Sequence, residues 1–201
     1  DAVDAGTWYA DDDGDLYGDP ADSEVECTQP SGYVADATDC DDGDGAVNPG
    51  ADEYCNGIDD DCDGLVDEAD AVDASTWYAD ADGDGFGDAS ASTSSCTQPS
   101  GYVADDSDCD DGDGTVSPAA TELCDGIDND CDGSVDEGDA ADAGTWYADT
   151  DGDGYGDPGS STDSCGRPAG YVADATDCDD ADGTVNPAAT EYCDGIDNDC
   201  D

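Results

Sequence analysis

Large apolar side chains are sparse along this chain and occur in short groups separated by runs of aspartate and glycine. Residues 7–9 (Thr-Trp-Tyr) and 32–34 (Gly-Tyr-Val) have the composition of short β-strands. Residues 118–124 carry a proline near their start and predict a helix of one or two turns. Residues 90–95, a Ser/Thr tract, predict a surface loop. We therefore expect a mostly irregular fold with small β elements and short helical turns.

The pattern repeats with a period of 69 residues, so that the dipeptide Trp-Tyr begins at positions 8, 77 and 146. This period predicts three repeats, residues 1–69, 70–138 and 139–201, in an elongated tandem array. The third repeat stops inside a motif that the earlier copies complete. We therefore expect it to be truncated inside its last calcium loop, within a longer array.

Each repeat has too few large side chains to be held together by a hydrophobic core alone. Ordering a repeat costs more conformational entropy than so small a core offsets, so metals or disulfides must contribute. The core candidates of the first repeat are Trp8, Tyr9, Tyr17, Tyr33, Val34, Val47, Tyr54, Ile58 and Val66.

The strongly acidic composition limits which classes of protein and partner are possible. The chain has 59 acidic residues against the single basic residue Arg167, for a formal net charge of −58. Bound metal, high salt or disorder would relieve this repulsion. Only seven of the acids are glutamate, and aspartate is favoured in tight calcium loops, so we favour metal. The charge argues against nucleic acid as a partner, and no apolar stretch is long enough for membrane insertion.

The strongest ligand pattern closes each repeat. It places Asp at loop positions 1, 3, 5, 9 and 12 and Gly at position 6, which is the spacing of an EF-hand calcium loop. Position 7 would contribute its backbone carbonyl, and position 12 is Asp instead of the usual bidentate Glu. The predicted ligands are Asp59, Asp61, Asp63, Leu65, Asp67 and Asp70; Asp128, Asp130, Asp132, Ser134, Asp136 and Asp139; and Asp197, Asp199 and Asp201.

A second loop with the same opening pattern follows each Trp-Tyr pair. It has no obvious carboxylate at position 12, so water or a remote Asp must complete the shell. Leu16 stands where the other copies have Gly, and we expect it to distort the turn. The predicted ligands are Asp11, Asp13, Asp15, Tyr17 and Asp19; Asp80, Asp82, Asp84, Phe86 and Asp88; and Asp149, Asp151, Asp153, Tyr155 and Asp157.

A third acidic cluster fits no loop template. It could bind an ion by itself, lend ligands to a neighbouring site, or form a turn held by a disulfide. Its predicted ligands are Asp39, Asp41 and Asp44; Asp108, Asp110 and Asp113; and Asp177, Asp179 and Asp182. Because all of these donors are oxygens, and His is absent from the chain, we expect calcium, with several ions per repeat.

The 12 cysteines recur at regular spacing, which predicts a disulfide framework and a secreted or cell-surface protein. A zinc site is the alternative, but no Cys-x-x-Cys is present. The four cysteines of a repeat allow three pairings, of which we favour the one that closes short loops around ligand clusters. The favoured pairs are Cys27–Cys40, Cys55–Cys62, Cys96–Cys109, Cys124–Cys131, Cys165–Cys178 and Cys193–Cys200.

Residues 108–133 (Asp-Cys-Asp-Asp through Cys-Asp-Gly-Ile-Asp-Asn-Asp-Cys-Asp-Gly) closely resemble the metal-binding motif family named after the copper protein MopE. The Asp-rich loops are also similar to thrombospondin type 3 repeats, which wrap around calcium ions. The resemblance implies a secreted metal-binding array. The copper of the family name transfers poorly, because the chain has neither His nor Met.

These observations predict an extracellular fibre, stalk or adhesin shaft made rigid by calcium, whose partners are neighbouring repeats or copies of itself. One alternative is a metal-sequestering protein, and another is a module that recognises glycans through calcium and Trp8, Trp77 and Trp146. We expect no enzymatic activity and no catalytic residue, because the chain has no His for acid–base chemistry and no nucleophile motif.

Overall fold

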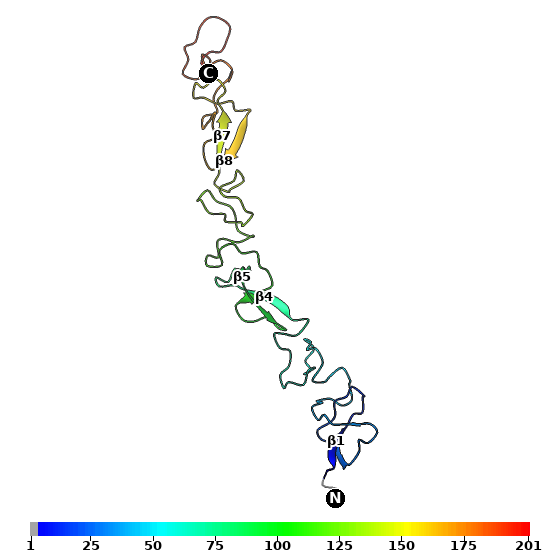
Figure 1. The fold of residues 1–201 in the computed structure, drawn as a ribbon. Helices are drawn as coiled ribbons and strands as arrows, with labels where there is room; N and C mark the ends of the chain where they lie inside the picture. The colour runs from blue at the N-terminus through cyan, green and yellow to red at the C-terminus, as the bar shows by residue number, and fades with distance from the viewer. Residues whose placement is uncertain (1–3) are drawn as a thin grey trace. The chain divides into compact units, whose positions relative to one another are not determined.

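The structure is a computed structural model that describes residues 4–201. Within these residues there are nine short strands and no helix, and loops connect them (Figure 1). The strands are β1 (Gly6–Ala10), β2 (Ser23–Glu26), β3 (Tyr33–Val34), β4 (Ser75–Ala79), β5 (Asp88–Ser95), β6 (Tyr102–Val103), β7 (Gly144–Ala148), β8 (Ser161–Ser164) and β9 (Tyr171–Val172). The predicted mostly irregular fold with small β elements, in tandem disulfide-stabilised repeats, is confirmed.

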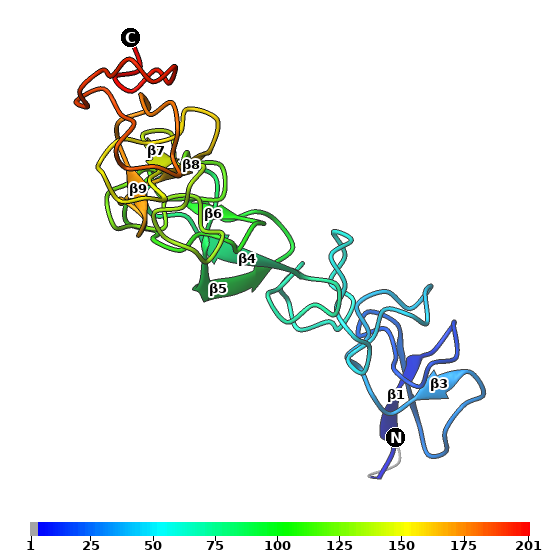
Figure 2. The same cartoon turned by 90° about the horizontal axis from the view of Figure 1, so that it is seen from above.

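Each repeat builds one three-stranded antiparallel sheet around its Trp-Tyr strand. The strand orders are β2-β1-β3, β5-β4-β6 and β8-β7-β9, and β3 lies beside β1 (Figure 2). In the first sheet Trp8 pairs with Glu24 and Tyr9 with Val34. The indole Nε1 of Trp8 donates a hydrogen bond to the carbonyl of Glu26 at 3.2 Å, which ties the ring to its own hairpin. The two predicted strands are therefore present, whereas the Ser/Thr tract expected as a loop belongs to β5.

The helix predicted at residues 118–124 does not form. The carboxylate of Glu122 accepts hydrogen bonds from the N–H of Asn129 at 2.8 Å and of Asp136 at 3.0 Å. The N–H of Leu123 donates to Oδ1 of Asn129 at 3.0 Å. Because these long-range bonds hold residues 122–123 against the following loop, the local backbone bonds of a helix cannot form.

The interior of the repeats is more polar than apolar. Only small or β-branched apolar side chains are buried, and larger ones such as Leu65 and Ile127 are exposed. Buried polar residues include Asp39, Glu53 and Glu122. Of the core candidates of the first repeat, Val34 and Val47 are buried, whereas Tyr54, Ile58 and Val66 are exposed, so the prediction of these three as core residues is wrong. The core is smaller than expected, so other interactions must hold each repeat in shape.

All six predicted disulfide pairings are wrong. The bonds are Cys40–Cys62, Cys109–Cys131 and Cys178–Cys200 within repeats, and Cys55–Cys96 and Cys124–Cys165 between consecutive repeats. They replace the predicted Cys27–Cys40, Cys55–Cys62, Cys96–Cys109, Cys124–Cys131, Cys165–Cys178 and Cys193–Cys200. Cys27 and Cys193 are unpaired and exposed.

The hairpin and the turns explain the observed pairing. Strand β5 ends at Ser95 opposite Ser75, which carries Cys96 to the end of the hairpin where the chain enters from the preceding repeat. Its sulfur lies 3.6 Å from the carbonyl oxygen of Glu68. Cys62 sits in a turn with a φ of 58° and its sulfur lies 3.2 Å from the N of Cys40. Short loop length therefore did not decide the pairing.

The chain divides into two compact units. The first comprises residues 1–81 and 87–106, and the second comprises residues 82–86 and 107–201. Each unit contains one of the disulfides that join consecutive repeats, so the repeats are covalently linked within each unit. The division at residues 1–69, 70–138 and 139–201 remains a prediction about the repeating unit.

Candidate metal centres

Each repeat contains two groups of converging carboxylates, which we call the opening-loop centre and the closing-loop centre. In the first repeat the opening-loop centre contains Asp11, Asp13 and Asp15, whose ligand oxygens lie within 4.8 Å of one another. Oδ1 of Asp13 accepts the N–H of Asp15 at 3.2 Å, and Oδ1 of Asp15 accepts that of Tyr17 at 2.8 Å. Their Oδ2 atoms are buried without a hydrogen-bond donor. In both Asp13 and Asp15, Oδ1 thus shapes the turn, whereas Oδ2 remains available to a cation.

The third acidic cluster supplies further carboxylates to this centre. Asp39 is 4% exposed, and Asp13, Asp39 and Asp42 also bring oxygens within 4.8 Å of one another. The N–H of Asp39 donates to the carbonyl of Gly18 at 3.3 Å, which anchors the cluster to the opening loop. The position of Asp39 and Asp42 beside Asp13 fits the alternative in which the cluster lends ligands to a neighbouring site, and Cys40–Cys62 also holds its turn.

The surroundings of the opening-loop centre disfavour the charged form of its carboxylates. Burial raises the pKa of Asp39, and the carboxylates of Asp15, Asp13 and Asp42 raise it further, although the N–H of Asp41 opposes the shift. The pKa of Asp13 is raised for the same reasons, with burial first. Buried carboxylate oxygens without a donor are costly unless a cation coordinates them.

The later repeats preserve this arrangement. Asp82, Asp84 and Asp108 bring ligand oxygens within 4.8 Å in the second. In the third, Oδ2 of Asp151 and Oδ2 of Asp177 are buried without a donor, and burial raises the pKa of both residues. Three copies of one unsatisfied carboxylate arrangement indicate a built site.

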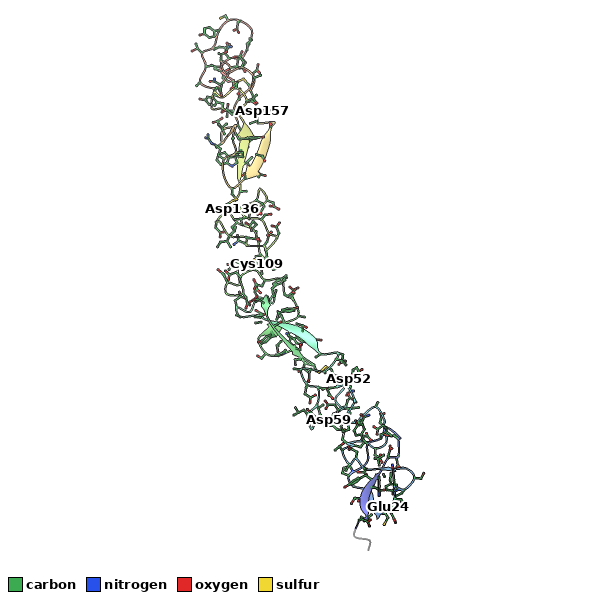
Figure 3. All side chains as sticks on the ribbon, viewed as in Figure 1. Glu24, Asp52, Asp59, Cys109, Asp136 and Asp157 are labelled. Carbon is green, nitrogen blue, oxygen red and sulfur yellow. A yellow bond between two sulfur atoms is a disulfide. The ribbon has the colours of Figure 1, made fainter. Side chains whose placement is uncertain are left out.

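The closing-loop centre includes two glutamates that the sequence prediction omitted. Glu53, Asp59 and Asp61 bring ligand oxygens within 4.8 Å of one another. Both carboxylate oxygens of Glu68 are buried without a donor. Burial raises the pKa of Glu68, and the carboxylates of Glu53, Asp63 and Asp61 raise it further. Glu68 is therefore near enough to these carboxylates to feel their charge, and its own two oxygens have no donor. Asp59 in the first repeat and Asp136 in the second both lie in loops outside the strands (Figure 3).

Parts of the closing-loop arrangement recur in the second and third repeats. The pKa of Glu137 is raised by burial and then by Asp132, Glu122 and Asp130. In the third repeat, Oδ1 of Asp199 is buried without a donor, and Asp201 and Glu191 raise its pKa after burial.

The sequence does contain a pattern that could have identified these glutamates as candidate ligands. Five of the seven glutamates in the chain occupy repeat-equivalent positions, namely Glu53, Glu122 and Glu191, and Glu68 and Glu137. In a chain that otherwise uses aspartate, a repeated glutamate marks a position where the longer side chain is needed. The EF-hand template drew attention to position 12 instead.

Several predicted ligands use their side chains to shape turns. Oδ1 of Asp67 accepts the N–H of Gly57 at 2.8 Å, and Oδ1 of Asp136 accepts that of Gly126 at 2.9 Å. The position-12 residues Asp70 and Asp139 are exposed. Oδ1 accepts a nearby backbone N–H in Asp19, Asp88, Asp157, Asp41, Asp44, Asp110, Asp113 and Asp182. Asp179, Asp197 and Asp201 are exposed.

The residues at position 7 and at position 1 of the loops also take part in hydrogen bonds that shape the turns. The N–H groups of Leu65, Phe86, Ser134 and Tyr155 donate to the Asp two residues earlier, as that of Tyr17 does. Asp149 accepts the N–H of Gly152, Asp128 accepts that of Gly133, and the N–H of Asp80 donates to Gly101.

The expected distortion at Leu16 is not seen. Leu16 adopts a φ of 86°, close to the values of 100° at Gly85 and 97° at Gly154. The hydrogen bond from Tyr17 to Asp15 measures 2.8 Å, and its counterpart from Tyr155 to Asp153 measures 2.9 Å. The loop keeps its shape, and the leucine backbone carries about 1–2 kcal/mol of strain.

Comparison with known families agrees with this geometry. The model of the MopE copper-binding family, described as "Putative metal-binding motif", matches residues 39–68, 108–137 and 177–201. The three segments are MopE-type metal-binding motifs. The first MopE-type motif begins at Asp39 and ends at Glu68, two carboxylates that the structure places in the two centres. No curated protein and no solved structure matches the chain.

The MopE-type motifs and the disulfides together identify a metal-binding repeat protein of the extracellular type. The donors of both centres are carboxylate oxygens, and several are buried without a hydrogen-bond donor, which fits a hard divalent cation. No helix among residues 4–201 is long and apolar enough to cross a membrane.

Asp39→Asn is expected to lower divalent-cation affinity at the first opening-loop centre by about tenfold. Asparagine retains the Oδ1 that accepts the N–H of Asp41 at 2.9 Å, but it replaces the buried Oδ2 with an amide that cannot coordinate a cation. Asp44→Asn is the matched control, because Asp44 is exposed and only its Oδ1 is used, by Ala46. Isothermal titration with calcium measures both variants, and equal affinities would contradict the placement of Asp39.

Proposed function

We propose that this chain is an extracellular structural repeat protein in which calcium ions hold each repeat in shape, and that it forms part of a fibre, stalk or adhesin shaft. The observation that carries the proposal is the convergence of buried carboxylate oxygens without hydrogen-bond donors, as at Asp13, Asp15 and Asp39. Calcium would neutralise these groups and replace the missing core as the source of order.

The donor set favours calcium over the copper of the family name. The sequence contains neither His nor Met, the side chains that copper sites use beside thiolate. Ten of the 12 cysteines form disulfides and so offer no thiolate. Clustered carboxylate oxygens suit calcium, which takes six to eight oxygen ligands.

The closing-loop centre lies beside the link between repeats, which supports a mechanical role. The carboxylate of Glu68 belongs to the centre, while its carbonyl oxygen lies 3.6 Å from the sulfur of Cys96 in the next repeat. The same contact joins Glu137 to Cys165 at 3.5 Å. An ion held by Glu68 would therefore stiffen the joint that the disulfide closes. Asp70, the predicted position-12 ligand of the same loop, is exposed.

The alternatives receive less support. The indoles of Trp77 and Trp146 are half-buried and donate to Ser95 and Ser164, so each ring is used in its own hairpin instead of being offered to a glycan. Independent buffering sites would not need to adjoin a disulfide joint. The proposal includes no catalytic activity, since the clustered carboxylates act as ligands.

Removing calcium tests the proposal. The chelated chain is expected to expand, with a larger hydrodynamic radius, a changed circular dichroism spectrum and rapid proteolysis, because the uncompensated carboxylates repel one another. Restoring calcium is expected to reverse all three changes, whereas magnesium at the same concentration is not. Identical radius and spectrum with and without calcium would refute a structural role for the ion.

A further inference from the structure

A disulfide connects the two candidate metal centres of each repeat. In the first repeat Cys40 directly follows Asp39, whose carboxylate belongs to the opening-loop centre. Its partner Cys62 directly follows Asp61, whose carboxylate belongs to the closing-loop centre. The bond holds the Cα atoms of the two cysteines 5.6 Å apart. The backbone that carries a ligand of one centre is therefore joined covalently to the backbone that carries a ligand of the other.

Further contacts fix the same two segments against each other. The Sγ atom of Cys40 lies 3.5 Å from the carbonyl oxygen of Asp59, another residue of the closing-loop centre. The N–H of Asn48 donates a hydrogen bond to the carbonyl of Asp60 at 2.9 Å. The segment that contains Cys40 and Asn48 thus lies along the closing loop, so the backbone of one cannot move far without moving the other.

The later repeats contain the same connection. Each of the three disulfides within repeats joins a cysteine that follows an aspartate of the third acidic cluster to a cysteine that follows an aspartate of the closing loop. The pairs of preceding residues are Asp39 and Asp61, Asp108 and Asp130, and Asp177 and Asp199. Asp177 is 4% exposed, and both Asp177 and Asp199 have a buried oxygen without a hydrogen-bond donor. The link therefore runs between unsatisfied carboxylates.

We propose that this disulfide couples the two centres of a repeat, so that a cation bound at one centre raises the affinity of the other. A cation at the closing-loop centre orders residues 59–63, and the disulfide transmits this order to residues 39–42. The opening-loop centre then loses less conformational entropy when its own cation binds. Because the coupling is an equilibrium property, it acts equally in both directions. The inference rests on the proposed calcium binding and adds how the sites of one repeat act together.

Residue-resolved titration tests the coupling, because each centre contains an amide that reports on it. The N–H of Tyr17 donates to Oδ1 of Asp15 at 2.8 Å in the opening loop. The N–H of Gly64 donates to Oδ2 of Asp59 at 3.1 Å in the closing loop. Calcium is titrated into the isotope-labelled chain, and nuclear magnetic resonance gives the calcium concentration at the midpoint of the shift for each amide.

Asp61→Asn is expected to raise the calcium midpoints of both amides. Asparagine keeps the Oδ1 that accepts the N–H of Asp63 at 3.2 Å, but it lacks the negative charge. The Gly64 midpoint reports the loss at the closing-loop centre itself, and the Tyr17 midpoint is expected to rise by about fivefold through the coupling. Asp70→Asn is the matched control, because it removes an exposed charge from the same loop and is expected to leave the Tyr17 midpoint unchanged.

Removing the disulfide shows whether it carries the coupling. In a chain with Cys40→Ala and Cys62→Ala, Asp61→Asn is expected to raise the Gly64 midpoint but to leave the Tyr17 midpoint unchanged. A rise at Tyr17 that persists without the disulfide would overturn the proposal, because the coupling would then take another route.

The second repeat provides a control in the same molecule, because its Cys109–Cys131 bond remains. Its reporter is the N–H of Phe86, which donates to Oδ1 of Asp84 at 2.9 Å. In the chain that lacks the first disulfide, Asp130→Asn is expected still to raise the Phe86 midpoint by about fivefold. A shift that survives only in the repeat that keeps its disulfide assigns the coupling to that bond.

A reciprocal measurement needs no cysteine variant. With all disulfides intact, Asp15→Asn is expected to raise the Gly64 midpoint by about fivefold, because the coupling is the same in both directions. A Gly64 midpoint that does not respond to Asp15→Asn, or a Tyr17 midpoint that does not respond to Asp61→Asn, would overturn the coupling and leave calcium binding intact. Amides that do not shift with calcium at all would instead refute the proposed function.

Discussion

Glu68→Gln is expected to weaken calcium binding at the first closing-loop centre by at least about tenfold while leaving the calcium-free chain no less stable. In the structure both carboxylate oxygens of Glu68 are buried without a donor among the carboxylates of Glu53, Asp61 and Asp63. Glutamine has the same shape but lacks the charge and one ligand oxygen. Without calcium the substitution removes a repelling charge, and its amide can donate to a neighbouring carboxylate.

The opposite signs of these two effects distinguish a ligand from a packing residue. A residue that only packs would lose stability equally with and without calcium. Asp70→Asn is the matched control, since Asp70 occupies the position-12 site of the loop template but is exposed. Calcium titration and thermal unfolding in chelator would be measured for both variants. A large loss of affinity in Asp70→Asn and none in Glu68→Gln would restore the EF-hand assignment and remove Glu68 from the centre.

Replacing both Cys55 and Cys96 with alanine is expected to lower the free energy of unfolding of the first unit by about 4 kcal/mol. The disulfide closes a sequence separation of 41 residues, and restricting so long a loop removes much entropy from the unfolded chain. With so few buried apolar side chains, the unit has little other stabilisation to offset the loss. Guanidinium unfolding in calcium, followed by tryptophan fluorescence, measures the change.

Cys27→Ala provides the control for that experiment. Cys27 occupies the same place in its repeat as Cys96 but forms no bond, so its substitution is expected to change the unfolding free energy by less than about 0.5 kcal/mol. Limited proteolysis adds a positional readout, because the double variant is expected to become sensitive between the closing loop and β4. Equal stability of the double variant and the control would show that the joint between repeats does not hold the unit together.

The sequence by itself determined the features that depend on neighbours along the chain. The period of 69 residues predicted three structural repeats. Three equivalent sheets and three MopE-type motifs are found. The spacing of Asp13 and Asp15, or of Asp61 and Asp63, predicted tight acidic loops. These loops form because each Oδ1 accepts an N–H only two residues away, an interaction that needs no tertiary contact.

Only the tertiary structure decided which distant groups meet. Asp39 joins Asp13 because the chain returns past Gly18, and Glu53 joins Asp59 because its carboxylate binds the N–H groups of Asp60 and Asp67. The same long-range bonds at Glu122 replaced the predicted helix. The disulfide pairing is set by where the hairpins end and not by loop length, so Cys55 bonds to Cys96 in the next repeat. Spacing describes local turns, whereas the path of the chain sets these contacts.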